Sequence, residues 1–127
     1  MVHFSVVHLL QKHHQYQQLV TTLARYSIIV HRYAHMKEVF TGGLRHMGMD
    51  FTDPQGAYFV LVNIEPYRRA GESDYDFCVR MVQEVGVAAV PGSSFFREDI
   101  NCYMRLHFAK CDEVLYEALN RLERLKG

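Results

Sequence analysis

The sequence predicts an α+β fold in which a small three-stranded sheet packs with helices and is preceded by a long or broken helix. A length of 127 residues is enough for one ordinary domain and too short for two. Hydrophobic residues make up 49% of the chain and the formal net charge is zero, whereas disordered chains combine low hydrophobicity with high net charge. Apolar residues recur at helical spacing in some stretches and at strand spacing in others.

The first part of the chain predicts helix. Residues 13–47 fit one helical period, but the β-branched run 28–30 and the pair Gly42-Gly43 favour interruptions, so we expect two helical pieces. Gly48 is expected to end the second piece. The sequence opens inside this helical pattern, which is typical of a domain cut from a longer chain.

A strand follows. The turn signal of residues 53–56 precedes residues 57–64, a continuous apolar and β-branched run. Because both faces of this run are apolar, it predicts a central strand.

The next element is a helix with clear end signals. Ser73, with Asp76 three residues later, fits a capping box, and Asp74 adds negative charge to the first turn. Apolar residues follow at helical spacing until Gly86, a natural C-terminal stop. The pair Asp74 and Asp76 therefore indicates a helix start rather than a paired-carboxylate site.

The remaining elements are two strands and a helix. Residues 87–90 predict a short strand that runs into a loop at 91–94. In the alternating segment 103–109, Tyr103, Arg105, His107 and Ala109 share one face and Met104, Leu106 and Phe108 share the other. A final amphipathic helix is expected from Asp112.

Composition excludes several partner classes. With 14 basic and 14 acidic residues and no basic stripe, we expect no nucleic-acid partner. The apolar start, at about ten residues, is too short to span a membrane, and it lacks the features of a secretory signal. Three cysteines without Cys-x-x-Cys spacing favour a reducing compartment, so we expect a cytoplasmic protein.

The eight histidines raise the question of a metal site. His13 and His14 are adjacent, and His31 and His35 lie four apart, which places both on one face of a helix. Zinc requires further ligands, and no cysteine or carboxylate stands at a recognised spacing. We therefore expect no metal site.

Arg105 is the strongest candidate for a functional residue. It is a cation inside a short apolar strand, where burial of an unpaired guanidinium is costly. Its planar fork can bind a carboxylate through two parallel hydrogen bonds. An internal salt bridge and an edge position facing water are equally consistent with the strand pattern.

Three motifs carry a resemblance to a known family. They are Pro54-Gln-Gly-Ala-Tyr-Phe, Gly86-Val-Ala-Ala-Val-Pro-Gly-Ser-Ser-Phe-Phe96 and Tyr103-Met-Arg-Leu-His-Phe, the last followed by Asp112-Glu-Val-Leu115. In this order they resemble the C-terminal small domain of class I/II aminotransferases, the pyridoxal-phosphate enzymes of fold type I, and most of all the kynurenine, glutamine and methionine aminotransferase branch. The resemblance implies the small domain at 33–127, after a helical lead-in at 1–32 whose match is uncertain.

The resemblance also implies functions for particular residues. It makes Arg105 the residue that binds the α-carboxylate of an amino-acid or keto-acid substrate, and it makes Pro91, Gly92 and Phe95 a loop that shapes the site. The family's cofactor lysine belongs to the large domain, and the lysines of this chain do not stand in the family's Ser-x-x-Lys setting. We therefore expect no catalytic residue in this chain.

The expected partners follow from this comparison. Pyridoxal phosphate would act in the complete enzyme, and this chain alone would bind none. Its partners would be the missing large domain and further copies in a homo-oligomer such as a dimer. The alternative is a non-catalytic module, derived from such an enzyme, that binds partners or self-associates through an exposed apolar face.

Overall fold

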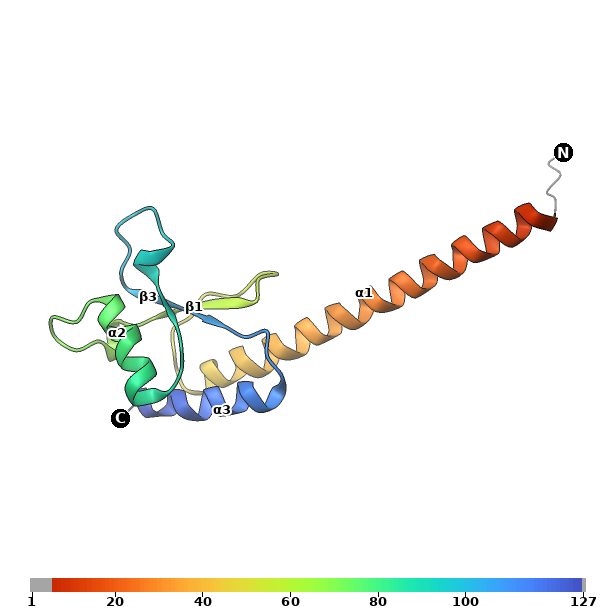
Figure 1. Cartoon of the computed structure of the whole chain (residues 1–127). Coiled ribbons are helices and arrows are strands. Elements are labelled where there is room, and N and C mark those ends of the chain that lie inside the picture. Colours follow the sequence, from red (N-terminus) through yellow and green to blue (C-terminus); the bar gives the residue numbers. More distant parts are fainter. Residues whose placement is uncertain (1–5, 127) are drawn as a thin grey trace. The chain divides into compact units, whose positions relative to one another are not determined.

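A computed structural model of the chain describes residues 6–126, with side chains from residue 12 onward. In chain order the helices and strands are α1 (Val6–His46), β1 (Phe59–Asn63), α2 (Asp74–Arg80), β2 (Val90–Pro91), β3 (Tyr103–His107) and α3 (Asp112–Leu122) (Figure 1). The chain divides after Ala34 into two compact units, and the sheet, α2 and α3 all belong to the second. The three strands and their helices confirm the α+β prediction.

Helix α1 runs unbroken from Val6 to His46, so the prediction of two helical pieces is wrong. The β-branched run costs no more than about 0.7 kcal/mol per residue in helix propensity. Gly43 has a packing reason to be in the helix, because a Cβ on it would lie 2.5 Å from Leu119 Cδ1 of α3. The end is as predicted: Gly48 has φ +74°, and its N–H donates to the carbonyl of Arg45.

The sheet has the strand order β1-β3-β2, and both pairings are antiparallel. Among the described residues β3 is therefore the middle strand and β1 an outer one, so the prediction that β1 is central is wrong. The other side of β1 carries only the single antiparallel bridge between Val62 and Phe51. The second apolar face of β1 explains the error. Phe59 and Leu61 are apolar but only half-buried, while Val60 and Val62 are fully buried.

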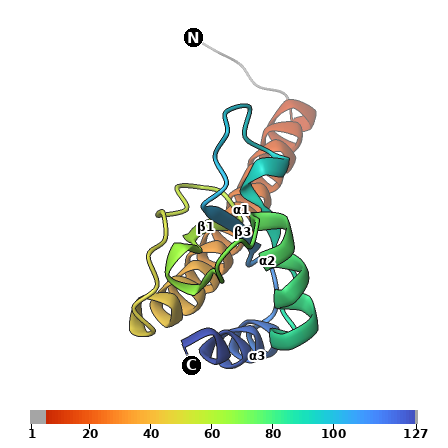
Figure 2. The same cartoon turned by 90° about the vertical axis from the view of Figure 1, so that its left-hand side faces the viewer.

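The predicted division of residues 103–109 into two faces is confirmed. Met104 and Leu106 are buried, whereas Tyr103 and Arg105 are half-buried and His107 is exposed. The Phe108 and Phe40 rings, one after β3 and one on α1, stack with centroids 6.1 Å apart. In the second unit the sheet packs against α2, α3 and the later turns of α1 (Figure 2). The buried hydrophobic residues of the core are Phe40, Leu44, Met47, Met49, Val60, Val62, Ile64, Phe77, Cys78, Met81, Val85, Met104, Leu106, Phe108, Leu115 and Leu122.

Helix α2 has the predicted ends. Ser73 Oγ accepts a hydrogen bond from the Asp76 N–H at 3.0 Å, which caps the first turn. The last turn widens to a π-helical segment, Met81–Val85, and stops at Gly86 with φ +81°. The strand after it is shorter and later than predicted, since β2 comprises only Val90 and Pro91.

Within residues 6–126 no helix has both the length and the apolar character needed to cross a membrane.

Candidate functional site

Arg105 lies at the centre of the sheet. It faces Leu61 of β1 on one side and Val90 of β2 on the other, so all three side chains lie on the half-buried face. This position excludes the edge-strand interpretation of Arg105, because β3 is the middle strand. The opposite face of β3 packs into the core and fixes the backbone from which the guanidinium extends.

Two phenylalanine rings contact the Arg105 guanidinium. Its Cζ lies 5.0 Å from the ring centroid of Phe59 and 5.1 Å from that of Phe95. Phe59 lies on β1, and Phe95 follows the turn after β2, so the two rings come from the segments on either side of β3. Such contacts attract a cation through the ring quadrupole and restrict its motion without using its N–H groups.

Those N–H groups have no acceptor in the described part of the chain. Among the side chains from residue 12 to 126, the Arg105 guanidinium forms neither a hydrogen bond nor an ion pair. The internal salt bridge considered for it is therefore not formed there. Arg80, in contrast, donates to the Glu72 carboxylate at 2.7 Å and to the Tyr67 carbonyl at 3.0 Å.

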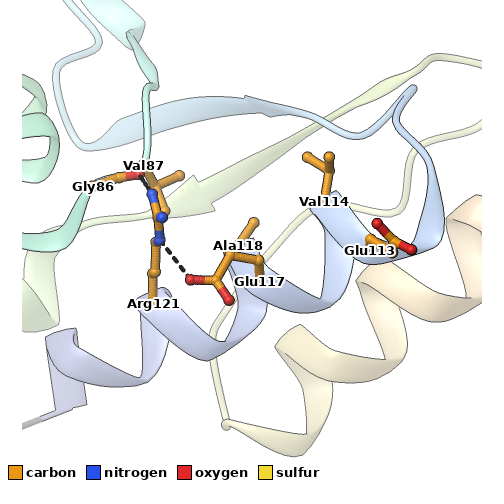
Figure 3. A pocket seen from close by; sticks show the side chains of 7 residues that line it. All are labelled: Gly86, Val87, Glu113, Val114, Glu117, Ala118 and Arg121. Atoms are coloured by element: carbon orange, nitrogen blue, oxygen red, sulfur yellow. Dashed lines mark hydrogen bonds and ion pairs between the residues drawn. The ribbon is translucent and has the colours of Figure 1, made fainter.

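Arg121 lies beside a surface groove and, unlike Arg105, forms hydrogen bonds within the fold. The groove, about 340 Å³ in volume, lies between α3 and the end of the π-helical segment. Arg121 Nε donates to Glu117 at 2.9 Å and its Nη1 donates to the Gly86 carbonyl at 2.9 Å (Figure 3). Its guanidinium is thus engaged within the fold, and the groove offers no unpaired cation to a ligand.

The loop residues Pro91, Gly92 and Phe95 lie next to Arg105. Val90 pairs with Arg105 and Pro91 with Met104. A Cβ on Gly92 would lie 3.0 Å from the Tyr103 carbonyl oxygen, so glycine is needed for the loop to approach β3 closely. The structure therefore brings the sequence-predicted loop to the predicted arginine.

Sequence reasoning missed how this loop is held. The Asp74 carboxylate is buried and accepts hydrogen bonds from both the N–H and the Oγ–H of Ser93. The helix-start interpretation of Asp74 accounted for its charge at the first turn but not for this contact across 19 residues. An acid at the start of a short helix and a Pro-Gly-Ser-Ser turn are the only signals, and neither specifies the pairing.

His31 and His35 contact different partners. His31 Nδ1 lies 2.6 Å from the Ser27 carbonyl oxygen, and His35 Nε2 lies 2.9 Å from each oxygen of Asp112. Among the described residues, no three histidine, cysteine or carboxylate side chains gather as metal ligands would.

The lysines do not match a cofactor-binding lysine. Lys37 Nζ lies 3.2 Å from Asp53 Oδ1 at the surface, and Lys110 and Lys126 are exposed. None of these side chains lies in the enclosed, desolvated setting of a Schiff-base lysine. These three lysines therefore do not fit the residue that would hold pyridoxal phosphate.

The fold is that of an aminotransferase small domain. The crystal structure of aspartate aminotransferase from Thermotoga maritima aligns with a TM-score of 0.67 and 33% identity, covering 79% of this chain and 24% of that one. The E. coli protein YbdL, for which a methionine aminotransferase function was identified, aligns with a TM-score of 0.65 and 30% identity, over 72% and 24% of the two chains.

Sequence comparison places the chain in a family. The model of "Aminotransferase class I and II" matches residues 4–122, so the chain belongs to this family, and the match includes most of the lead-in before Tyr33. The Thermotoga maritima aspartate aminotransferase is 33% identical over 109 residues, which are 86% of this chain and 26% of that protein. A probable N-acetyl-LL-diaminopimelate aminotransferase of Bacillus subtilis is 39% identical over 77 residues, or 61% and 19%. The chain thus spans about a quarter or less of these relatives' lengths.

Proposed function

We propose that residues 33–127 are the C-terminal small domain of a pyridoxal-phosphate-dependent amino-acid aminotransferase, and that Arg105 binds the α-carboxylate of its substrate. The observation that carries the proposal is the Arg105 guanidinium, which contacts two rings and has no anionic partner among the described side chains. The short span of the chain relative to its relatives supports a partial enzyme.

The geometry suits this role. A carboxylate that meets the guanidinium edge gains two parallel charge-assisted hydrogen bonds, which fix its orientation as well as its position. The Phe59 and Phe95 rings exclude water from beside the guanidinium, and a lower local dielectric strengthens both bonds. Because Arg105 extends from the middle strand, it would hold the substrate on a rigid element.

Catalysis would need residues beyond those that the structure describes. Pyridoxal phosphate supplies the electron sink for amino-group transfer, and the protein supplies binding and orientation. This chain would provide only the carboxylate contact and would not transaminate alone. The kynurenine, glutamine and methionine branch is supported by the likeness to the methionine enzyme, and the three unpaired cysteines agree with a cytoplasmic location.

Carboxylate binding can be measured on the chain itself. We expect pyruvate to shift the side-chain Nε–Hε signal of Arg105 in NMR spectra, and its uncharged methyl ester to leave the signal unchanged. Arg105→Lys keeps the charge but loses the fork, so we expect it to weaken pyruvate binding by about tenfold, as the loss of one charge-assisted hydrogen bond would. The matched control is Arg97→Lys, because Arg97 is exposed and lies in the loop after Phe96.

Two results would contradict the proposal. One is an Arg105 signal that does not respond to pyruvate, or a response of equal size to the methyl ester. The other is a stoichiometric, borohydride-fixed adduct of pyridoxal phosphate at a single lysine of this chain. Such an adduct, located by mass spectrometry, would show that the chain holds the cofactor without a large domain.

A non-catalytic, self-associating module is the second candidate. Large apolar side chains of α1 are exposed on several sides, with Tyr16 at 65%, Leu23 at 58% and Ile29 at 57%. Apolar surface of this kind is normally covered by protein. If copies cover one another, sedimentation will show a dimer that Leu23→Glu dissociates while Thr21→Glu does not. A monomer at high concentration would exclude this function.

A further inference from the structure

The Asp74 carboxylate joins two segments next to Arg105. Asp74 is the first residue of α2, and it is 3% exposed. Asp74 Oδ2 accepts the Ser93 N–H at 2.8 Å, and Oδ1 accepts the Ser93 Oγ–H at 3.0 Å and the Tyr75 N–H at 2.9 Å. Three donors therefore converge on one buried carboxylate.

Ser93 belongs to a short 3-10 turn, Gly92–Ser94, that leads directly into Phe95. The N–H groups of Phe95 and Phe96 both donate to the Gly92 carbonyl, at 3.1 and 3.0 Å. The turn is thus a compact unit, and wherever Ser93 is held, the start of Phe95 is held as well. The Phe95 ring in turn lies 5.1 Å from Arg105 Cζ.

We propose that Asp74 is a positioning residue for the Arg105 site: its carboxylate holds Ser93, and through the turn it keeps the Phe95 ring against the guanidinium. Asp74 does not touch the substrate in this arrangement. The effect on carboxylate binding rests on the proposed function of Arg105, whereas the effect on the contact between Phe95 and Arg105 does not.

An amide of the same shape is a weaker anchor for the turn than the carboxylate. Three donors converge on Asp74, and an asparagine would offer them one acceptor oxygen and one NH2 group, which cannot accept. Either the Ser93 N–H loses its acceptor, or the Ser93 hydroxyl must turn to accept from the NH2 group and the Tyr75 N–H is left without an acceptor. In both cases the negative charge that strengthens the bonds to the turn is removed. Ser93→Ala is milder, because it removes the Oγ–H donor and leaves the backbone N–H bond in place.

The test uses the full chain and two readouts. The first is the nuclear Overhauser effect between the Phe95 ring protons and the side-chain protons of Arg105, which needs no ligand. The second is the dissociation constant for pyruvate. We expect Asp74→Asn to weaken the Overhauser effect and to raise the dissociation constant for pyruvate about tenfold. We expect Ser93→Ala to raise this dissociation constant less. The matched control, Asp76→Asn, removes an exposed acid from the same helical turn and should change neither.

Leu115→Val is the control that distinguishes a general loss of stability from a loss of positioning. Leu115 is buried in α3, so this variant lowers stability without touching the turn. We expect Leu115→Val to leave both readouts unchanged. If it changes them as much as Asp74→Asn does, Asp74 has only a structural role. If Asp74→Asn does not fold, Ser93→Ala carries the test.

The two proposals fail in different ways. If Asp74→Asn and Ser93→Ala both keep the contact between Phe95 and Arg105, the positioning role of Asp74 is wrong. If the unmodified chain does not bind pyruvate while the two variants still lose that contact, the carboxylate-binding function of Arg105 is wrong and the positioning role stands.

Discussion

Arg80 donates two parallel hydrogen bonds to Glu72. Its Nε donates to Glu72 Oε2 at 2.7 Å and its Nη2 donates to Oε1 at 2.9 Å, and both side chains are largely buried. The Arg69 N–H also donates to Oε1, at 3.0 Å. The pair joins the last residue of α2 to the segment before the helix.

This pair makes stability depend on pH. The hydrogen bond from Arg80 lowers the pKa of Glu72 from 4.5 to about 2. Glu72 therefore contributes fully above pH 4.5, where it is ionised in both the folded and the unfolded chain, and this contribution is lost as the pH falls toward 2. We expect Glu72→Gln to lower the free energy of unfolding at pH 7 by about 1.5–3 kcal/mol and to flatten the acid slope.

Urea unfolding between pH 3 and pH 7 measures this effect. Glu98→Gln is the control, since Glu98 is exposed in the loop after Phe96. An unchanged slope in Glu72→Gln would show that the pair does not govern acid stability.

Two adjacent glycines of α1 should respond oppositely to alanine. Nothing lies within 4 Å of a Cβ on Gly42, so Gly42→Ala should stabilise the chain by about 0.5–1 kcal/mol through helix propensity. A Cβ on Gly43 would overlap Leu119 of α3, so Gly43→Ala should be less stable than Gly42→Ala by about 1–3 kcal/mol. Thermal unfolding of both variants measures the difference, and equal stabilities would contradict the close packing of α1 on α3.

Gly92→Ala should displace the turn that carries Phe95. The new Cβ would lie 3.0 Å from the Tyr103 carbonyl oxygen and 3.3 Å from that of Ile100, and neither backbone oxygen can move aside cheaply. We expect a loss of about 1–3 kcal/mol in unfolding free energy and a shifted Phe95 signal. The neighbouring Ser94 is exposed, so Ser94→Ala should do neither. A Phe95 signal unchanged in Gly92→Ala would refute the close approach.

The two rings should contribute to carboxylate binding. Phe59→Leu and Phe95→Leu each remove one contact with the Arg105 guanidinium, and a loss of about 0.5–1 kcal/mol would weaken pyruvate binding roughly two- to fivefold. Phe51→Leu is the control, because that ring lies near Arg45 instead. Titration of the Arg105 signal measures all three, and equal affinities would rule out a role for the rings.

Local patterns in the sequence predicted the parts of the fold that are set locally. Alternation placed Arg105 on the half-buried face of its strand, because side chains of a strand alternate whatever the strand pairs with. Ser73 and Gly86 marked the ends of their helix because capping and left-handed backbone depend on neighbouring residues alone.

Features set by distant contacts were not predictable in this way. Gly43 favours a helix break by propensity, and only the nearby Leu119 side chain shows why a residue without a Cβ fits at this position of the helix. The outer position of β1 depends on which strand lies between the other two. The hydrogen bonds that Ser93 donates to Asp74, and the contacts of the two rings with Arg105, join segments whose spacing in the sequence carries no signal.

The strand order also determines when the sheet can form. Among the described residues, β1 and β2 each pair with β3 and not with each other. On a ribosome, β1 therefore emerges with only its bridge to Phe51, and some forty residues are made before it can pair with β3. The strand that bears Arg105 is the one that joins the other two, so a chain stopped short of Tyr103 would have neither of these pairings and no assembled site.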